Sequence, residues 1–145
     1  MDINRFFKTV LSQNAEDLRK YFQKNAVIKW HCTNEAFTLY EYIKANCEYP
    51  GNWNGEIERI EENENTIILA CQVFSTDNSE SFHVVSFIHL KDGLIIKMGE
   101  YWSDDGLAPE WRKKMKIGKI IRKIGLDTVL IGVISGYIKI QSCLS

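Results

Sequence analysis

Apolar and polar side chains alternate over most of residues 55–103, and short polar segments interrupt the alternation. Successive side chains of a β-strand point to opposite faces, so this pattern is typical of strands with one buried face. It predicts strands over residues 55–62, 66–75, 80–91 and 94–103, separated by the turns ENEN (62–65), TDNS (76–79) and KDG (91–93). Turns this short connect antiparallel neighbours. The second half of the chain is therefore predicted to form an antiparallel meander.

Three helix patterns precede the meander. Asp2 can cap the first, whose apolar stripe at helical spacing is Ile3, Phe6, Phe7, Val10 and Leu11. Asn14 followed by Asp17 marks the start of a second helix, with Phe22 on its buried side. Thr38 and Glu41 have the spacing of a capping box for a third helix, which Pro50-Gly51 ends.

The order of these elements indicates the fold class. A strand over residues 25–32 is expected between the second and third helices, so the predicted order is α-α-β-α-β-β-β-β. Helices followed by a meander are typical of α+β proteins. We expect three N-terminal helices packed against a curved, mainly antiparallel sheet that forms a cone with an interior.

The Asp92-Gly93 turn sets an expected register for the last two strands. Asp-Gly is typical of two-residue hairpin loops, in which Lys91 would face Leu94. Extending this register pairs Phe87 with Met98, Val85 with Glu100 and His83 with Trp102 on one face. Lys97 lies on the other face of the strand and belongs in water, so the face with Met98, Glu100 and Trp102 is predicted to be the interior. The same logic across the earlier turns adds Ile68, Ala70 and Gln72, and then Ile57 and Arg59.

The predicted interior has the composition of a small-molecule pocket. It is mostly apolar, and it includes a few polar side chains: His83, Glu100, Gln72 and Arg59. His31 and Trp53 are expected at the rim, and Trp102, Met98 and Phe87 are expected to line it. The tryptophans can equally be packing residues, since they are large apolar side chains first.

Glu100 and His83 are the candidate acid/base residues. Burial in an apolar pocket would raise the pKa of Glu100, so that it could accept or donate a proton near neutral pH. The alternative is structural, with Glu100 paired to Arg59 or His83. No short His/Cys spacing predicts a metal site, and we expect no cofactor.

Composition and charge bear on nucleic-acid binding, cellular location and membrane contact. The net charge is −1, which does not predict nucleic-acid binding, although residues 112–123 carry seven basic and no acidic side chains. The four cysteines form no ligand motif and no secretory leader is evident, so a reducing cytoplasmic location is expected. Residues 126–140 are apolar but shorter than the roughly 20 residues that span a bilayer, and membrane contact by this tail is not expected.

Several stretches together resemble the SnoaL-like branch of the nuclear-transport-factor-2-like superfamily. They are FFKTVLSQNAEDLRKYF, FTLYEYIKANCEYPGNW, SFHVVSFIHLKDGLIIKMGEYW and DDGLAPEWR. The resemblance implies one cone domain over residues 1–116, followed by a basic and then apolar extension over 117–145. Enzymes of this superfamily hold an acid/base residue deep in the cone, and by position Glu100 and His83 match that pattern.

The resemblance leaves two functions open. In one, the cone binds an apolar or aromatic small molecule, with or without cofactor-independent acid/base chemistry of the isomerase, cyclase or hydrolase type. The sequence has no counterpart of the isomerases' tyrosine and two acids. In the other, the domain is a noncatalytic module that forms a homodimer through the outer sheet face, predicted to carry Val84, Ser86, Gly99 and Tyr101.

Overall fold

A computed structural model describes residues 1–122, and the predicted apolar tail lies outside this range. The chain divides into two compact units, Met1–Asp105 and Gly106–Ser145. The first contains the sheet and helices α1 to α3, and the second contains the short helix α4 (Glu110–Lys114). The predicted boundary after residue 116 stays a prediction, and residues 106–116 fall in the second unit. No helix within residues 1–122 is long and apolar enough to cross a membrane.

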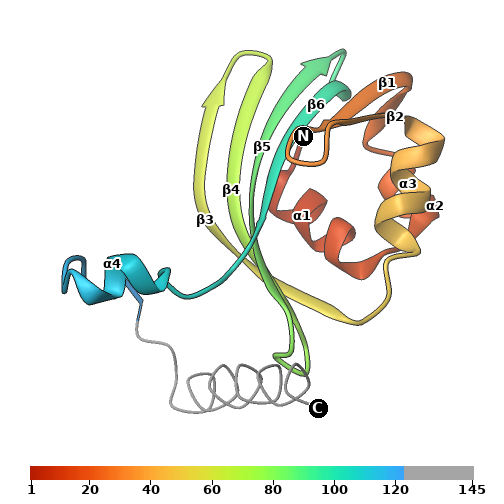
Figure 1. Cartoon of the computed structure of the whole chain (residues 1–145). Helices are drawn as coiled ribbons and strands as arrows, with labels where there is room; N and C mark the ends of the chain where they lie inside the picture. Colours follow the sequence, from red (N-terminus) through yellow and green to blue (C-terminus); the bar gives the residue numbers. More distant parts are fainter. Residues whose placement is uncertain (123–145) are drawn as a thin grey trace. The chain divides into compact units, whose positions relative to one another are not determined.

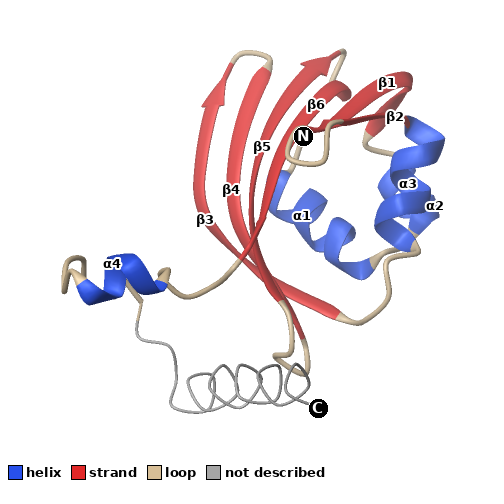
Figure 2. Cartoon of the chain, in the orientation of Figure 1, coloured by secondary structure: helices blue, strands red, loops and turns tan. Residues whose placement is uncertain are grey.

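The described residues form one curved six-stranded sheet (Figures 1 and 2). The strands are β1 (Phe22–Trp30), β2 (Glu35–Thr38), β3 (Trp53–Asn63), β4 (Thr66–Ser75), β5 (Ser81–Lys91) and β6 (Leu94–Asp104). Their spatial order is β2-β1-β6-β5-β4-β3, in which β1 and β6 run parallel and every other neighbouring pair is antiparallel. The predicted α+β class and four-stranded meander are confirmed.

Three helices of the first unit lie on the concave side of the sheet: α1 (Ile3–Ser12), α2 (Ala15–Arg19) and α3 (Leu39–Cys47) (Figure 1). Each begins at the cap that its sequence predicts. Asp2 and Asn14 accept hydrogen bonds from backbone N–H groups of the first turn, and Thr38 forms a reciprocal capping box with Glu41.

Two local predictions were wrong. Helix α2 is shorter than expected, because Phe22 already belongs to β1, where it pairs with Ile95 of β6. Strand β2 was not predicted, since its four residues show no clear alternation of burial. It forms because residues 35–38 return along the edge of β1 and satisfy its backbone hydrogen bonds.

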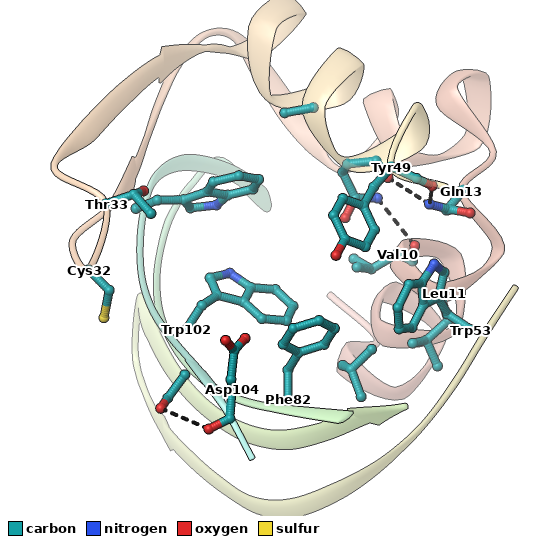
Figure 3. A pocket seen from close by; sticks show the side chains of 15 residues that line it. Val10, Leu11, Gln13, Cys32, Thr33, Tyr49, Trp53, Phe82, Trp102 and Asp104 are labelled. Carbon is teal, nitrogen blue, oxygen red and sulfur yellow. Dashed lines mark hydrogen bonds between the residues drawn. The ribbon is translucent and has the colours of Figure 1, made fainter. Parts of the chain in front are cut away.

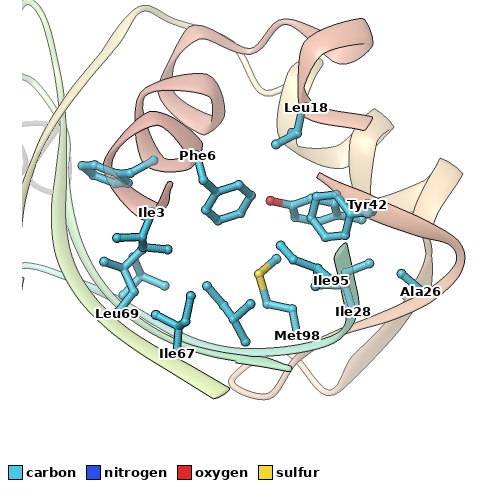
Figure 4. Close-up of a cluster of buried hydrophobic side chains, with 14 of the residues drawn as sticks. Ile3, Phe6, Leu18, Ala26, Ile28, Tyr42, Ile67, Leu69, Ile95 and Met98 are labelled. Carbon is cyan, nitrogen blue, oxygen red and sulfur yellow. The ribbon is translucent and has the colours of Figure 1, made fainter. Parts of the chain in front are cut away.

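The core fills the space between the helices and the concave face (Figure 4). Alternate residues of β4 point into it, namely Ile67, Leu69, Cys71 and Val73. The helices contribute Phe6, Leu18 and Tyr42, and the rings of Phe6 and Tyr42 both contact Phe22. Burying each large apolar side chain contributes about 1.5–3 kcal/mol, so these helices are held mainly by tertiary packing.

A β-bulge in β6 reverses the predicted faces of the meander. Lys91 pairs with Leu94 and Leu90 with Ile95, as predicted, but His89 then pairs with Lys97, which leaves Ile96 as an extra residue. Because side chains alternate with period two, one extra residue moves every later partner to the opposite face.

As a result, part of the predicted interior lies on the outer face. Phe87 pairs with Gly99 and is 39% exposed, so its predicted inward position is wrong. His83, Gln72 and Arg59 also point outward. The pairing of β4 with β5 follows the predicted register, with Gln72 opposite His83. The wrong face predicted for β5 therefore gave the wrong face for β4 as well. In β3 a second irregularity, at Glu58, separates inward Ile57 from outward Arg59.

Conversely, two residues predicted on the outer face are interior. Val84 and Ser86 are 4% and 3% exposed and lie opposite Trp102 and Glu100. Glu100 is buried on the interior face, as predicted. The prediction holds because it was made from Lys97, which follows the bulge on the same strand, so the alternation between Lys97 and Glu100 is not interrupted.

Candidate functional site

A cavity of about 550 Å³ opens at one end of the concave face (Figure 3). Its wall is assembled from the C-terminal ends of α1 and α3, the turn after β1, and parts of β3, β4, β5 and β6. A volume of this size is in the range that holds a drug-sized molecule.

Aromatic rings dominate the wall. They are Trp30, Tyr49, Trp53, Phe82 and Trp102. The ring of Phe82 lies between those of Trp53 and Trp102, with centroid separations of 5.7 Å and 6.3 Å. The ring centroids of Tyr49 and Trp53 are 5.4 Å apart. Edge-to-face and tilted pairs at these distances favour a rigid wall that presents both faces and edges of rings.

Hydrogen bonds between α1 and the end of α3 position Tyr49. Gln13 adopts a left-handed conformation at the end of α1, and its side-chain amide donates to the carbonyls of Asn46 (2.9 Å) and Tyr49 (2.7 Å). Asn46 in turn donates to the carbonyl of Val10 (3.2 Å). The two helix ends are therefore joined at the rim of the cavity (Figure 3).

Gly51 positions the next aromatic residue. Its φ of +112° is a conformation that side-chain-bearing residues rarely adopt. A Cβ at this position would lie 3.3 Å from the Trp53 ring, so the backbone passes directly over the indole. Within the described residues, Trp53 Nε1 is buried and has no hydrogen-bond partner.

Glu100 lies behind the wall rather than in it. The residue is 6% exposed, and its carboxylate accepts hydrogen bonds from Trp30 Nε1 (2.9 Å), Trp102 Nε1 (3.0 Å) and Ser86 Oγ (2.8 Å). Burial raises the pKa of Glu100, and the three hydrogen bonds partly oppose this change. Glu100 is therefore suited to orienting two indole rings whose other atoms line the cavity.

Asp104 is the acidic side chain of the cavity wall. Of the fifteen described lining residues it is the one carboxylate, and none of them carries a positive charge. Its side chain points toward Trp102 and Phe82 (Figure 3). Burial raises the pKa of Tyr49, and the negative charges of Glu80 and Asp104 raise it further.

The other predicted site residues lie elsewhere. His83 and Glu100 do not meet, because His83 is on the outer face, where its two ring nitrogens contact Glu58 (2.8 Å) and Asp105. Gln72 donates to Ser81 and Asp105 beside it. The Arg59–Glu100 pair, considered as a structural alternative for Glu100, is also absent from the described structure, and Arg59 contacts Glu61.

Of the remaining residues predicted to line the pocket, some do and others do not. Trp53 and Trp102 do line the cavity. His31 does not, because it stacks on Tyr101 at 4.5 Å on the outer face, above Gly99. Met98 points inward but belongs to the packed core, and Phe87 contacts Tyr101 outside. Within residues 1–122 no group of three or more His, Cys, Asp or Glu side chains is arranged to hold a metal ion.

Sequence reasoning missed Tyr49, Phe82 and Asp104 as lining residues. Phe82 has a usable signal, because the alternation along β5 places it on the same face as Val84 once the bulge is known. Asp104 lies one residue beyond the strand predicted over residues 94–103. Tyr49 follows α3, and only the folded chain brings it beside Trp53.

Comparison of the whole structure with solved structures identifies the fold. A candidate ketosteroid isomerase from Kribbella flavida is similar, with a TM-score of 0.68 and 20% identity over 83% of this chain and 88% of that one. The chain has the nuclear-transport-factor-2-like fold. No family model matches the sequence, and no curated protein matches it significantly.

Two further structures share this fold. A candidate SnoaL-like polyketide cyclase from Shewanella putrefaciens has a TM-score of 0.59 at 7% identity, covering 69% of this chain and 85% of that one. A protein of ketosteroid isomerase-like fold from Catenulispora acidiphila, in complex with trimethylamine, has a TM-score of 0.59 at 10% identity, covering 70% and 85%. At these identities the likeness shows the fold alone.

Proposed function

We propose that the domain binds an apolar or aromatic small molecule in the cavity. The observation that carries the proposal is the cavity of about 550 Å³, walled by five aromatic side chains and containing Asp104 as its one described carboxylate. Such pockets, mostly apolar with a few placed polar groups, are the usual form of small-molecule sites. The fold supports the proposal, because compared structures of this fold include one in complex with a small molecule, trimethylamine.

Acid/base chemistry by Glu100 and His83 is not part of this proposal. The two side chains lie on opposite faces of the sheet, and two indoles separate Glu100 from the cavity. A reaction on the bound molecule would have to use a group in the wall, where Asp104, Tyr49 and Cys32 are the ionisable side chains of the described lining. The expected absence of a cofactor and the cytoplasmic location both stay predictions.

Filling the cavity tests the proposal directly. Ala45 lines it from α3, so Ala45→Phe should occupy its volume while keeping a helix-compatible residue. The probe is the uncharged dye N-phenyl-1-naphthylamine, followed by its fluorescence gain. We expect saturable binding by the wild type and by Ala45→Ser, which preserves the space, and at least a tenfold loss in Ala45→Phe. Equal binding by all three proteins would refute a ligand site in the cavity.

A second candidate function is self-association through the outer sheet face. Val27, Phe87 and Tyr101 are 41%, 39% and 47% exposed there, and the last two rings are 6.0 Å apart. Exposed apolar side chains grouped on a sheet are typical of interaction surfaces. We propose a homodimer formed through this face.

Sedimentation equilibrium tests this second proposal. Phe87→Glu and Tyr101→Glu should each convert a dimer to a monomer, because a charge would be buried at the interface. Tyr40→Glu is the control, since Tyr40 is 68% exposed on α3, on the other side of the sheet. A wild-type protein that is monomeric at high micromolar concentration would refute the proposal.

A further inference from the structure

The charge of the cavity wall indicates which molecules it can accept. Asp104 supplies a negative charge, and no described lining residue supplies a positive one. The carboxylate receives no hydrogen bond and no ion pair from any described side chain, in contrast to Asp105, which is engaged by Ser81 and His83 on the outer face. An anionic ligand would be repelled, whereas a cation would find an unpaired partner.

The aromatic rings favour the same sign of charge. A ring face is electronegative, and it attracts a cation placed within about 6 Å of its centroid. Tyr49, Trp53, Phe82 and Trp102 form a continuous series of neighbouring rings, and the carboxylate of Asp104 lies beside the Phe82 and Trp102 end of this series (Figure 3). These apolar surfaces cannot replace the water shell of a small inorganic ion, so they suit an organic cation, which is weakly hydrated.

Glu100 strengthens this preference from behind the wall. Both indole N–H groups, of Trp30 and Trp102, donate to the same carboxylate oxygen, Oε2, at 2.9 and 3.0 Å. Donation to a carboxylate shifts electron density from the N–H into the indole, which makes the ring face more electronegative. Trp30 and Trp102, two of the three tryptophans that line the cavity, are thus polarised toward binding a cation.

We propose that the cavity selects an organic ammonium ion, namely a protonated tertiary amine or a quaternary ammonium group on an apolar or aromatic body, with Asp104 as its counter-ion. The inference rests on the proposed binding function and names the class of molecule bound. The ammonium group lies against Trp102 and Phe82 beside the carboxylate of Asp104, and the apolar body extends toward Trp53 and Val73.

A pair of isosteric probes separates charge from shape. Benzyltrimethylammonium and neopentylbenzene differ only in nitrogen against carbon, and phenylacetate supplies an anion of similar size. Each competes with N-phenyl-1-naphthylamine for the wild type, for Asp104→Asn and for the control Asp92→Asn, whose carboxylate lies in the distant β5–β6 turn. Circular dichroism verifies that each variant is folded.

We expect the wild type and Asp92→Asn to bind the ammonium probe at least tenfold more tightly than neopentylbenzene, and phenylacetate least. In Asp104→Asn the preference should fall to less than threefold while neopentylbenzene binds as before. If the dye and neopentylbenzene bind but the ammonium probe has no advantage, the cation proposal is overturned and the binding function stands. If no probe binds, both are overturned.

Discussion

Replacing Glu100 with glutamine should make the protein more stable at neutral pH than the wild type. Burial raises the pKa of Glu100 in the folded protein above its ordinary value, about 4.3. Below pH 4 the carboxyl is protonated in both the folded and the unfolded chain. As the pH rises further, the unfolded chain loses the proton first, so the wild type loses stability until the pH passes the folded-state pKa.

The size of this effect follows from the same linkage. In that pH window the free energy of unfolding of the wild type falls by up to about 1.4 kcal/mol per pH unit, relative to a chain without the titrating group. Each unit by which the folded-state pKa is raised lowers the stability above this window by about 1.4 kcal/mol in total. Glutamine avoids the loss and keeps the hydrogen bonds. Its carbonyl can accept from the indoles of Trp30 and Trp102, and its amide can donate to Ser86 Oγ, whose hydroxyl turns to accept.

Alanine provides the contrast at the same position. Glu100→Ala leaves two indole N–H groups and one hydroxyl without their acceptor, at about 1–3 kcal/mol for each buried unpaired donor. We therefore expect Glu100→Ala to be about 3 kcal/mol or more less stable than Glu100→Gln at every pH.

Urea unfolding between pH 4 and 8, followed by tryptophan fluorescence, measures these differences. The other titrating groups are shared by wild type and variant, so they cancel when the free energies of unfolding are subtracted. The stability of Glu100→Gln minus that of the wild type should rise with pH and then level off. A difference that is constant or that falls with pH would refute the assignment of Glu100 as a buried carboxylate with a raised pKa.

Three further predictions concern the scaffold. Thr38→Ala removes the cap of α3 and should cost about 1 kcal/mol in urea unfolding, whereas Thr38→Ser should be nearly neutral. Gly55→Ala should cost about 1–3 kcal/mol, because its Cβ would lie 2.6 Å from a ring carbon of Phe7 and 2.8 Å from a backbone oxygen of β4; an unchanged unfolding midpoint would contradict this packing. Cys32 is exposed and should react with a thiol reagent at pH 8 in the native protein. Cys71, buried with its thiol pKa raised to about 12, should react only after unfolding, as peptide mapping would reveal.

Local patterns in the sequence determined most of the secondary structure. The caps at Asp2, Asn14 and Thr38 and the Asp92-Gly93 turn act within four residues, so their neighbours along the chain suffice to predict them. Strand positions in the meander also followed, because alternating burial is a property of each segment alone.

The tertiary structure decided which face of each strand became the interior. Ile96 is accommodated as a bulge that no local pattern announces, and with a side-chain period of two it moved His83 and Phe87 outward and Ser86 inward. The cavity was likewise beyond local reasoning. Tyr49 and Asp104 come from segments far apart in the chain, and they line one cavity only because the curved sheet and the joined ends of α1 and α3 enclose a common space.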